Sequence, residues 1–173
     1  MFTTRNAVLP DAPAIERLIR VHVGDGTLLP RSIAEICENI RDFVVVERDG
    51  EIVGCGALHL YGPHLAEIRS ITVTQGSKGY GAGRALVEEL FREAERHGVQ
   101  SICLFTRIPE FFARMDFRQV AHELLPDKIY KDCQRCSRRN ACDEVAMVRG
   151  ELPKYSILAP LYAARQPLTS IAR

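Results

Sequence analysis

Three glycines stand at alternate positions just before a run of strong helix formers, in the stretch SKGYGAGRALVEEL. Glycine loses more backbone freedom on folding than any other residue, so their place beside a helix needs a physical reason. The first N–H groups of a helix have no intrahelical acceptor and carry partial positive charge, and residues without side chains let a phosphate reach them. The stretch therefore favours a pyrophosphate-binding turn over a plain connector. It comprises the glycines Gly79, Gly81 and Gly83 and the basic flanks Lys78 and Arg84.

Two better-known phosphate loops do not match this stretch. A P-loop needs G-x-x-x-x-G-K-[ST], but Gly81 is followed by Ala82, Gly83 and Arg84. A dinucleotide-binding turn needs G-x-G-x-x-G near the first strand of its unit, whereas the spacing here is G-x-G-x-G after several strands. What remains is the general affinity of a glycine-rich helix N-terminus for anions.

The chain has six cysteines, and three of them, Cys133, Cys136 and Cys142, form a C-x2-C-x5-C pattern. The C-x2-C part is typical of a metal knuckle or a redox pair. A closed zinc site needs a fourth ligand, which His122, Asp143 or a partner chain would have to supply. Nearby basic residues are expected to lower the pKa of the thiols. The pattern leaves a structural zinc and a disulfide as equal alternatives, with inert thiols as a third.

Composition limits the class of protein. The chain has 173 residues, enough for one domain with a substantial core. Lys and Arg number 23 and Asp and Glu number 22, a net charge of +1, which argues against a dedicated nucleic-acid binder. No apolar run has the length of a membrane span, and the N-terminus has no signal-peptide core. We therefore expect a cytoplasmic protein without nucleic-acid or membrane partners, and a homodimer stays open.

Apolar periodicity and turn signals predict an α/β (α+β) domain around one twisted sheet. Asp11 is the expected N-cap of an early helix, and Ser32 with Glu35 forms the capping box of a second. Asp49-Gly50 joins two apolar runs as a hairpin turn. The expected strands are 3–8, 43–61 (a hairpin), 66–73, 101–106, 118–124 and 143–149, and the expected helices are 11–23, 32–40, 84–97 and 109–117. We assign residues 1–150 to the domain, 127–143 to a cysteine-bearing insert within it and 151–173 to a tail of unclear role.

The stretch ITVTQGSKGYGAGRALVEEL resembles the acetyl-CoA signature of the GNAT family of N-acetyltransferases, Q/R-x-x-G-x-G/A between a central strand and a helix. Lys78, Gly81 and Gly83 occupy its three defining positions, although Lys78 lacks the planar guanidinium of the usual arginine. The stretch PEFFARMDF resembles the family's aromatic-rich helix, with Asp116 where glycine is common. The resemblance covers about residues 3–150. It implies acetyl-CoA as co-substrate, and a mixed, mostly antiparallel sheet whose central strands splay to hold it.

Four further stretches resemble the short, stand-alone N-acetylglutamate synthases of bacterial arginine biosynthesis. They are LLPRSIAEICENIRDF, LAEIRSITV, PEFFARMDFRQV and KDCQRCSRRNACDEVAMV. The resemblance implies transfer of acetyl from acetyl-CoA to the α-amine of L-glutamate, the first step of that pathway, by direct attack in a ternary complex.

Acetyl transfer needs a neutral amine, so a base must remove a proton from the ammonium group of glutamate. Glu67 matches the position where the family often carries a catalytic glutamate and is the expected base. Arg69, and Arg31 in the loop LLPRS, are expected to bind a substrate carboxylate through bidentate hydrogen bonds. The simpler alternative is that Glu67 and Arg69 face solvent. In a regular strand one face would hold Glu67, Arg69, Ile71 and Val73, and the other Ile68, Ser70 and Thr72.

The resemblance also implies how the rest of acetyl-CoA is held. Backbone groups at Ile71 and Val73 are expected to bind the pantetheine amides. Phe112 stands where many relatives place a tyrosine that protonates the leaving thiolate, and phenylalanine cannot donate a proton. We therefore expect Phe112 to pack the acyl and pantetheine region, and the general acid stays unassigned. The expected acetyl-CoA-binding residues are Ile71, Thr72, Val73, Lys78, Gly79, Tyr80, Gly81, Ala82, Gly83, Arg84 and Phe112.

Two other functions stay open. A transferase for another small amine, such as a polyamine, should present acidic residues to its substrate, whereas Arg31 and Arg69 favour an anionic one. A non-catalytic acyl-CoA sensor, or a metal-stabilised interaction module built around the cysteines, would tolerate the loss of Glu67.

Overall fold

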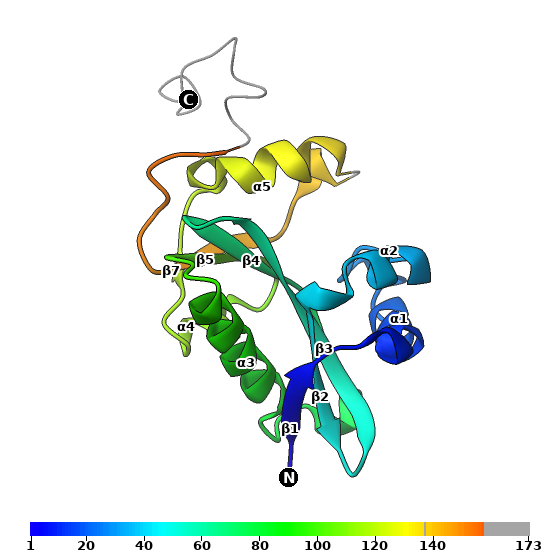
Figure 1. The fold of residues 1–173 in the computed structure, drawn as a ribbon. Helices are drawn as coiled ribbons and strands as arrows, with labels where there is room; N and C mark the ends of the chain where they lie inside the picture. The colour runs from blue at the N-terminus through cyan, green and yellow to red at the C-terminus, as the bar shows by residue number, and fades with distance from the viewer. Residues whose placement is uncertain (137, 158–173) are drawn as a thin grey trace. The chain divides into compact units, whose positions relative to one another are not determined.

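The computed structural model describes residues 1–136 and 138–157, so most of the predicted tail lies outside the described residues. The strands are β1 (Thr3–Asn6), β2 (Phe43–Arg48), β3 (Glu51–Gly62), β4 (Leu65–Val73), β5 (Ile102–Thr106), β6 (Arg118–Gln119) and β7 (Val145–Arg149). The helices are α1 (Ala12–Arg20), α2 (Ile33–Glu38), α3 (Ala82–Arg96), α4 (Pro109–Ala113) and α5 (Pro126–Lys131). In the described residues the strands form one mixed, open sheet in the order β1-β2-β3-β4-β5-β7-β6, flanked by helices (Figure 1), which confirms the predicted fold class.

The chain forms two compact units that interleave along the sequence. The N-terminal unit comprises Met1–His59 and Ile68–His97, and the C-terminal unit comprises Leu60–Glu67 and the chain from Gly98 on. Strands β3 and β4 each pass from one unit into the other, since the breaks fall within them. The predicted domain, residues 1–150, therefore includes the whole N-terminal unit and part of the C-terminal unit.

The turn and the helix cap predicted in the N-terminal unit are both formed. In this unit β2 pairs antiparallel with both β1 and β3. The turn between β2 and β3 places Asp49 at φ 56° and Gly50 at φ 80°. Both are left-handed, as a two-residue turn that matches the strand twist requires, and this confirms the predicted hairpin. At α2 the Ser32 hydroxyl accepts from the Glu35 N–H (3.2 Å), and the Glu35 carboxylate accepts from the Ser32 N–H (2.8 Å). The predicted capping box is therefore present.

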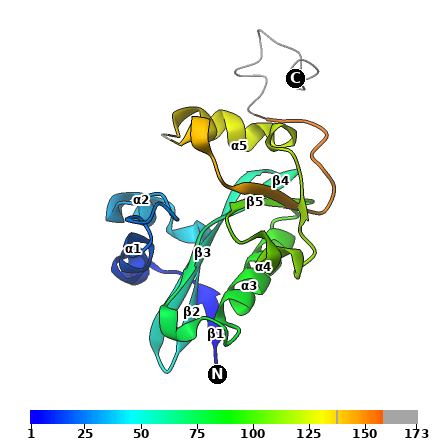
Figure 2. The same ribbon diagram turned by 180° about the vertical axis from the view of Figure 1, so that it is seen from behind.

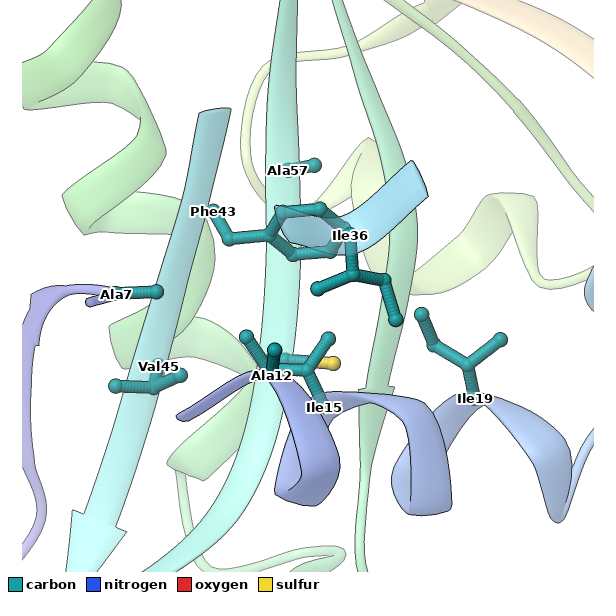
Figure 3. Close-up of a cluster of buried hydrophobic side chains, with 9 residues drawn as sticks. Ala7, Ala12, Ile15, Ile19, Ile36, Phe43, Val45 and Ala57 are labelled. Atoms are coloured by element: carbon teal, nitrogen blue, oxygen red, sulfur yellow. The ribbon is translucent and has the colours of Figure 1, made fainter. Parts of the chain in front are cut away.

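Helices cover both faces of the strands of the N-terminal unit: α1 and α2 pack on one face and α3 on the other (Figures 1 and 2). Figure 3 shows the first face, where Ile15, Ile19 and Ile36 of the two helices lie against Phe43 and Ala57 of the strands. All five side chains are buried. Burial of apolar side chains on this scale supplies most of the stability of such a layer.

Asp11 stands at the N-cap position of α1, as the sequence predicts, but its carboxylate makes no capping hydrogen bond to the helix. Its carboxylate binds the Arg5 guanidinium at 2.6 and 3.1 Å and accepts a hydrogen bond from the Val8 N–H at 2.8 Å. The hydrogen bond from Arg5 lowers the pKa of Asp11, although burial opposes the shift. The carboxylate thereby closes a 3-10 turn at Leu9–Asp11 that precedes the helix. The predicted N-cap position is confirmed, but the carboxylate binds Arg5 from β1, a distant partner that a local helix pattern cannot reveal.

The C-terminal unit is built on β5, which pairs antiparallel with β7 along its length and parallel with the start of β4 through two residue pairs. The strand predicted at 118–124 is shorter than expected. Only Arg118–Gln119 forms β6, because the chain then turns through His122–Leu124 towards α5. Asp116 has φ 65°, a left-handed conformation that glycine adopts freely and that Asp tolerates better than most other residues.

No helix within the described residues combines the length and the apolar character needed to cross a membrane.

We expect Gly54→Ala to destabilise the N-terminal unit. A Cβ at Gly54 would lie 2.7 Å from Val73 Cγ1 and 2.8 Å from the Thr72 carbonyl oxygen. Because a backbone oxygen in β4 cannot move without disturbing the sheet, the free energy of unfolding should fall by about 1–3 kcal/mol. Urea unfolding checks this against Gly24→Ala, whose added Cβ meets nothing within 4 Å. Equal stability of the two variants would contradict the packing.

Candidate functional site

The glycine-rich stretch forms an open turn at the start of α3. Gly79 has φ 80° and Gly81, the N-cap of the helix, has φ 95°, a region that residues with a Cβ rarely adopt. An added Cβ at either glycine would meet no protein atom within 4 Å, so the space beside both is open. The helix begins at Ala82, two residues earlier than predicted, because Gly83 adopts helical geometry in the first turn.

The first turn of α3 offers unsatisfied donors to this open space. The first intrahelical bond runs from the Ala85 N–H to the Gly81 carbonyl (2.9 Å), so the N–H groups of residues 82–84 precede the helical ladder. Lys78 and Arg84 are exposed on either side of the turn and add positive charge. The donors, the charge and the missing side chains could accommodate a diphosphate group, whose binding at this turn stays a prediction.

Strand β4 leads into this turn and carries an irregularity at Ser70, which has φ 53°. A left-handed residue interrupts the alternation of side chains in a strand. Arg69 lines a cavity with Ala57, whereas Ile71 Cγ1 lies 3.5 Å from where a Cβ of Gly56 would stand, on the opposite face of β3. The prediction that Arg69 and Ile71 share one face is therefore wrong, because it assumed a regular strand.

The two arginines expected to bind substrate are both among the residues that line that cavity. Arg31, from the loop before α2, and Arg69, from β4, both line it, although 38 positions separate them in the sequence. The cavity lies wholly within the N-terminal unit. Its other lining residues are Glu35, Ile36, Asn39, Asp42, Phe43, Ala57 and Ser70.

The cavity is lined by two basic side chains, Arg31 and Arg69, and two acidic ones, Glu35 and Asp42. The Glu35 carboxylate already accepts hydrogen bonds from Ser32, which lower its pKa and hold it at the helix start. Asp42 lies 3.6 Å from Nδ1 of His59, and the same ring nitrogen accepts a hydrogen bond from Arg69 Nη2 at 3.1 Å. Because Nδ1 of His59 accepts from Arg69, it has no proton to donate to Asp42, so the side chains that line the cavity comprise two arginines and two acids. Guanidinium groups bind carboxylates through two parallel hydrogen bonds.

Glu67 lies in the C-terminal unit and does not face solvent, since it is 2% exposed. Its Oε2 accepts a hydrogen bond from the Tyr61 hydroxyl at 2.7 Å, and its Oε1 lies 2.6 Å from Lys128 Nζ. Burial and then the nearby Glu67 charge raise the pKa of Tyr61 far above its ordinary value. The solvent-facing alternative for Glu67 is therefore wrong, and its carboxylate is held at both oxygens.

Sequence reasoning missed both partners of Glu67. Tyr61 could have been found, because a tight turn between the two strands brings residues near 61 beside residues near 67. Lys128 carried no such signal, since it belongs to the irregular insert and lies 61 positions downstream of Glu67.

Phe112 is buried at 2% exposure in α4. Its ring packs edge-on against Phe111 at 5.0 Å and Phe117 at 5.8 Å between centroids. The side chain therefore belongs to an aromatic cluster of the C-terminal unit, and its contact with an acyl group stays a prediction.

The three cysteines of the insert are free thiols in this structure, half-buried at Cys133 and Cys136 and exposed at Cys142. Among residues 1–136 and 138–157, no three His, Cys, Asp or Glu side chains are grouped as a metal ion would require. Burial raises the pKa of the Cys133 thiol, even though Lys128 opposes the shift. The expected lowering of that pKa by basic neighbours is wrong for Cys133, because desolvation is the larger effect.

Three comparisons place the chain among known proteins. The sequence profile of the acetyltransferase (GNAT) family matches residues 19–117. An uncharacterized N-acetyltransferase of Chlorobaculum tepidum is 42% identical over 145 residues, which cover 84% of this chain and 94% of that protein. The amino-acid acetyltransferase of Mycobacterium tuberculosis is 35% identical over 119 residues, 67% of this chain and 68% of that protein.

A solved structure is also similar to this chain. N-acetylglutamate synthase from Neisseria gonorrhoeae, crystallised with coenzyme A and N-acetyl-glutamate, superposes with a TM-score of 0.78 at 28% identity. The match covers 87% of this chain but 35% of that protein. The similarity therefore concerns one part of a longer enzyme.

Proposed function

Because the chain belongs to the acetyltransferase (GNAT) family, we propose that it transfers acetyl from acetyl-CoA to the α-amine of an amino acid, and that the amino acid is L-glutamate. The single observation that supports this substrate is the cavity that both Arg31 and Arg69 line. The name of the Mycobacterium tuberculosis relative, and the N-acetyl-glutamate bound to the Neisseria gonorrhoeae enzyme, support an acidic amino acid.

The glycine turn would hold the diphosphate of acetyl-CoA. N–H groups at Ala82 and Gly83 would donate to the phosphate oxygens, and the ammonium group of Lys78 would add charge. The backbone of Ile71 and Val73, on the strand that leads into the turn, would bind the pantetheine amides. CoA in the Neisseria gonorrhoeae structure supports this co-substrate.

The arginine cavity would hold a carboxylate of the amino acid. A polyamine has no carboxylate for Arg31 and Arg69 to bind, and both guanidinium groups would repel its ammonium groups, although Glu35 and Asp42 line the same cavity. Glutamate offers two carboxylates and one amine, so binding a carboxylate leaves the amine available for reaction. The two arginines therefore support an acidic amino acid over a polyamine.

Glu67 would act as general base. It would take the proton from the ammonium group, and the amine nitrogen would then attack the thioester carbonyl of acetyl-CoA in a ternary complex. The resulting tetrahedral species collapses with loss of the CoA thiolate, the second proton leaves the nitrogen for the thiolate or solvent, and the amide product keeps the acetyl group. A positioned base of this kind typically contributes ~10²–10⁴-fold to the rate.

Thiol release from acetyl-CoA, measured over the twenty amino acids and several polyamines, tests this function. We expect L-glutamate to give the highest kcat/KM. Faster turnover of a polyamine would overturn the proposed substrate in favour of another small amine. Binding of acetyl-CoA without thiol release for any amine would indicate an acyl-CoA sensor instead.

We expect Arg69→Ala to raise KM for glutamate by about 10–150-fold, because a charge-assisted hydrogen bond contributes about 1.5–3 kcal/mol. KM for acetyl-CoA should change by no more than about twofold, which corresponds to much less free energy than the ~1.4 kcal/mol of a tenfold change. Steady-state kinetics with each substrate varied in turn check this, and Arg20→Ala serves as control because that side chain is 68% exposed on α1. Equal rises in both KM values would point to damage to the fold rather than to a substrate contact.

A further inference from the structure

Lys128 is the charged partner of Glu67, and it is not among the site residues predicted from the sequence. Its ammonium group lies 2.6 Å from Glu67 Oε1 and 2.9 Å from Asp132 Oδ2, and its side chain is 13% exposed. The ammonium group also lies 5.6 Å from the centre of the Phe105 ring, within the range of a cation–π contact. Burial alone would lower the pKa of Lys128, but Glu67 and Asp132 together raise it above its ordinary value. The side chain therefore stays charged.

The helix that carries Lys128 is anchored by its neighbour in the sequence. Asp127 is fully buried and accepts hydrogen bonds from His64 Nε2 at 2.8 Å and from the Ser156 hydroxyl at 2.6 Å. In this cluster the carboxylate joins the serine and the histidine, so the histidine does not contact the hydroxyl as a base of a hydrolytic triad would. The contacts of Asp127 instead hold the start of α5, and with it Lys128, against the rest of the C-terminal unit.

A buried carboxylate without a counter-charge takes up a proton, because desolvation disfavours its charged form. Glu67 is 2% exposed, yet a general base must be ionised before it can accept a proton. Lys128 is the cation in direct contact with it among the described residues. The other titratable groups around Glu67 are Tyr61 from β3, Cys103 from β5, and Asp132 and Cys133 after α5.

We propose that Lys128 is the positioning residue that keeps Glu67 ionised and oriented, so that Glu67 can act as base at neutral pH. This inference rests on the proposed function of Glu67. Tyr61 donates to the other carboxylate oxygen and completes the orientation, but as a neutral group it cannot replace the positive charge. The ammonium group of Lys128 does not itself touch the reacting amine in this scheme.

The pH profile of kcat/KM for glutamate tests the proposal. In Lys128→Met the unpaired carboxylate should have a raised pKa, so the acid limb of the profile should move up by about one to three pH units. Activity should then recover as the pH rises. Lys128→Arg keeps a positive charge and should return the limb close to its original position. Lys154→Met, in the same unit but 85% exposed, is the matched control and should leave the limb unmoved. An unmoved acid limb in folded Lys128→Met would overturn the proposal.

A second measurement does not depend on activity. Removing Lys128 leaves a buried charge unpaired, so Lys128→Met should lower the melting temperature. Adding Glu67→Gln removes that charge, and the double variant should melt at a higher temperature than Lys128→Met alone. If the double variant melts at the higher temperature but the protein acetylates no amine, the ion pair of Lys128 and Glu67 is supported and only the proposed function is rejected. A double variant that melts below Lys128→Met would overturn the pairing itself.

Discussion

Gly81→Val is expected to weaken the binding of acetyl-CoA by about 100-fold. The valine side chain would stand in the open space beside the first turn of α3, where the diphosphate is expected to bind. Valine also disfavours the φ of 95° found at Gly81, so the turn itself would shift. Loss of two charge-assisted hydrogen bonds, at about 1.5 kcal/mol each, corresponds to this factor. Calorimetric titration with acetyl-CoA measures it directly.

The matched control for this variant lies at the other end of the same helix. Gly98 also has a left-handed φ, 66°, and an added Cβ there also meets nothing within 4 Å. Gly98→Val should therefore show a similar loss of folding stability without a loss of affinity for acetyl-CoA. If both variants bound acetyl-CoA as tightly as the unmodified protein, the turn would have no part in binding.

Glu67→Gln is expected to lower kcat by ~10²–10⁴-fold at neutral pH while the affinity for acetyl-CoA stays unchanged. The amide keeps the size of the side chain and can still accept a hydrogen bond from Tyr61, but it cannot take a proton from the amine. Activity should rise at high pH, where the substrate amine loses its proton to solvent. Stopped assays of N-acetyl product across pH check the size and the pH dependence of the effect.

Folding must be controlled in this experiment, because Glu67→Gln leaves Lys128 with Asp132 as its remaining carboxylate partner. Thermal unfolding of the variant shows whether the C-terminal unit stays intact. Glu123→Gln, an exposed acid of the same unit, should change neither kcat nor stability. Normal turnover of Glu67→Gln at neutral pH would mean that Glu67 has a structural role alone.

Features that depend on neighbouring residues could be predicted from the sequence. The hairpin turn at Asp49 and Gly50 follows from the left-handed geometry that these two residue types accept. The capping box of Ser32 and Glu35 and the open turn at Gly81 likewise rest on backbone requirements of one short segment. In each case the local preference and the folded conformation agree.

Features that depend on distant residues could not be predicted in this way. Asp11 has the right type and place for a helix cap, but Arg5 in a neighbouring strand competes for its carboxylate. The left-handed φ of Ser70 could not be predicted from its residue type, since serine rarely adopts this conformation. It turns Arg69 to the opposite face from Ile71. Lys128 reaches Glu67 only through the fold of an insert that lacks periodicity.

The proposed transfer is tested most directly by following the acetyl group itself. The protein is incubated with acetyl-CoA carrying a ¹³C-labelled acetyl group, together with L-glutamate, and the products are identified by NMR and mass spectrometry. We expect labelled N-acetyl-L-glutamate, formed in equal amount to the released CoA thiol and lost in Glu67→Gln. Thiol release without a labelled amide, or a labelled amide on another amine in preference to glutamate, would contradict it.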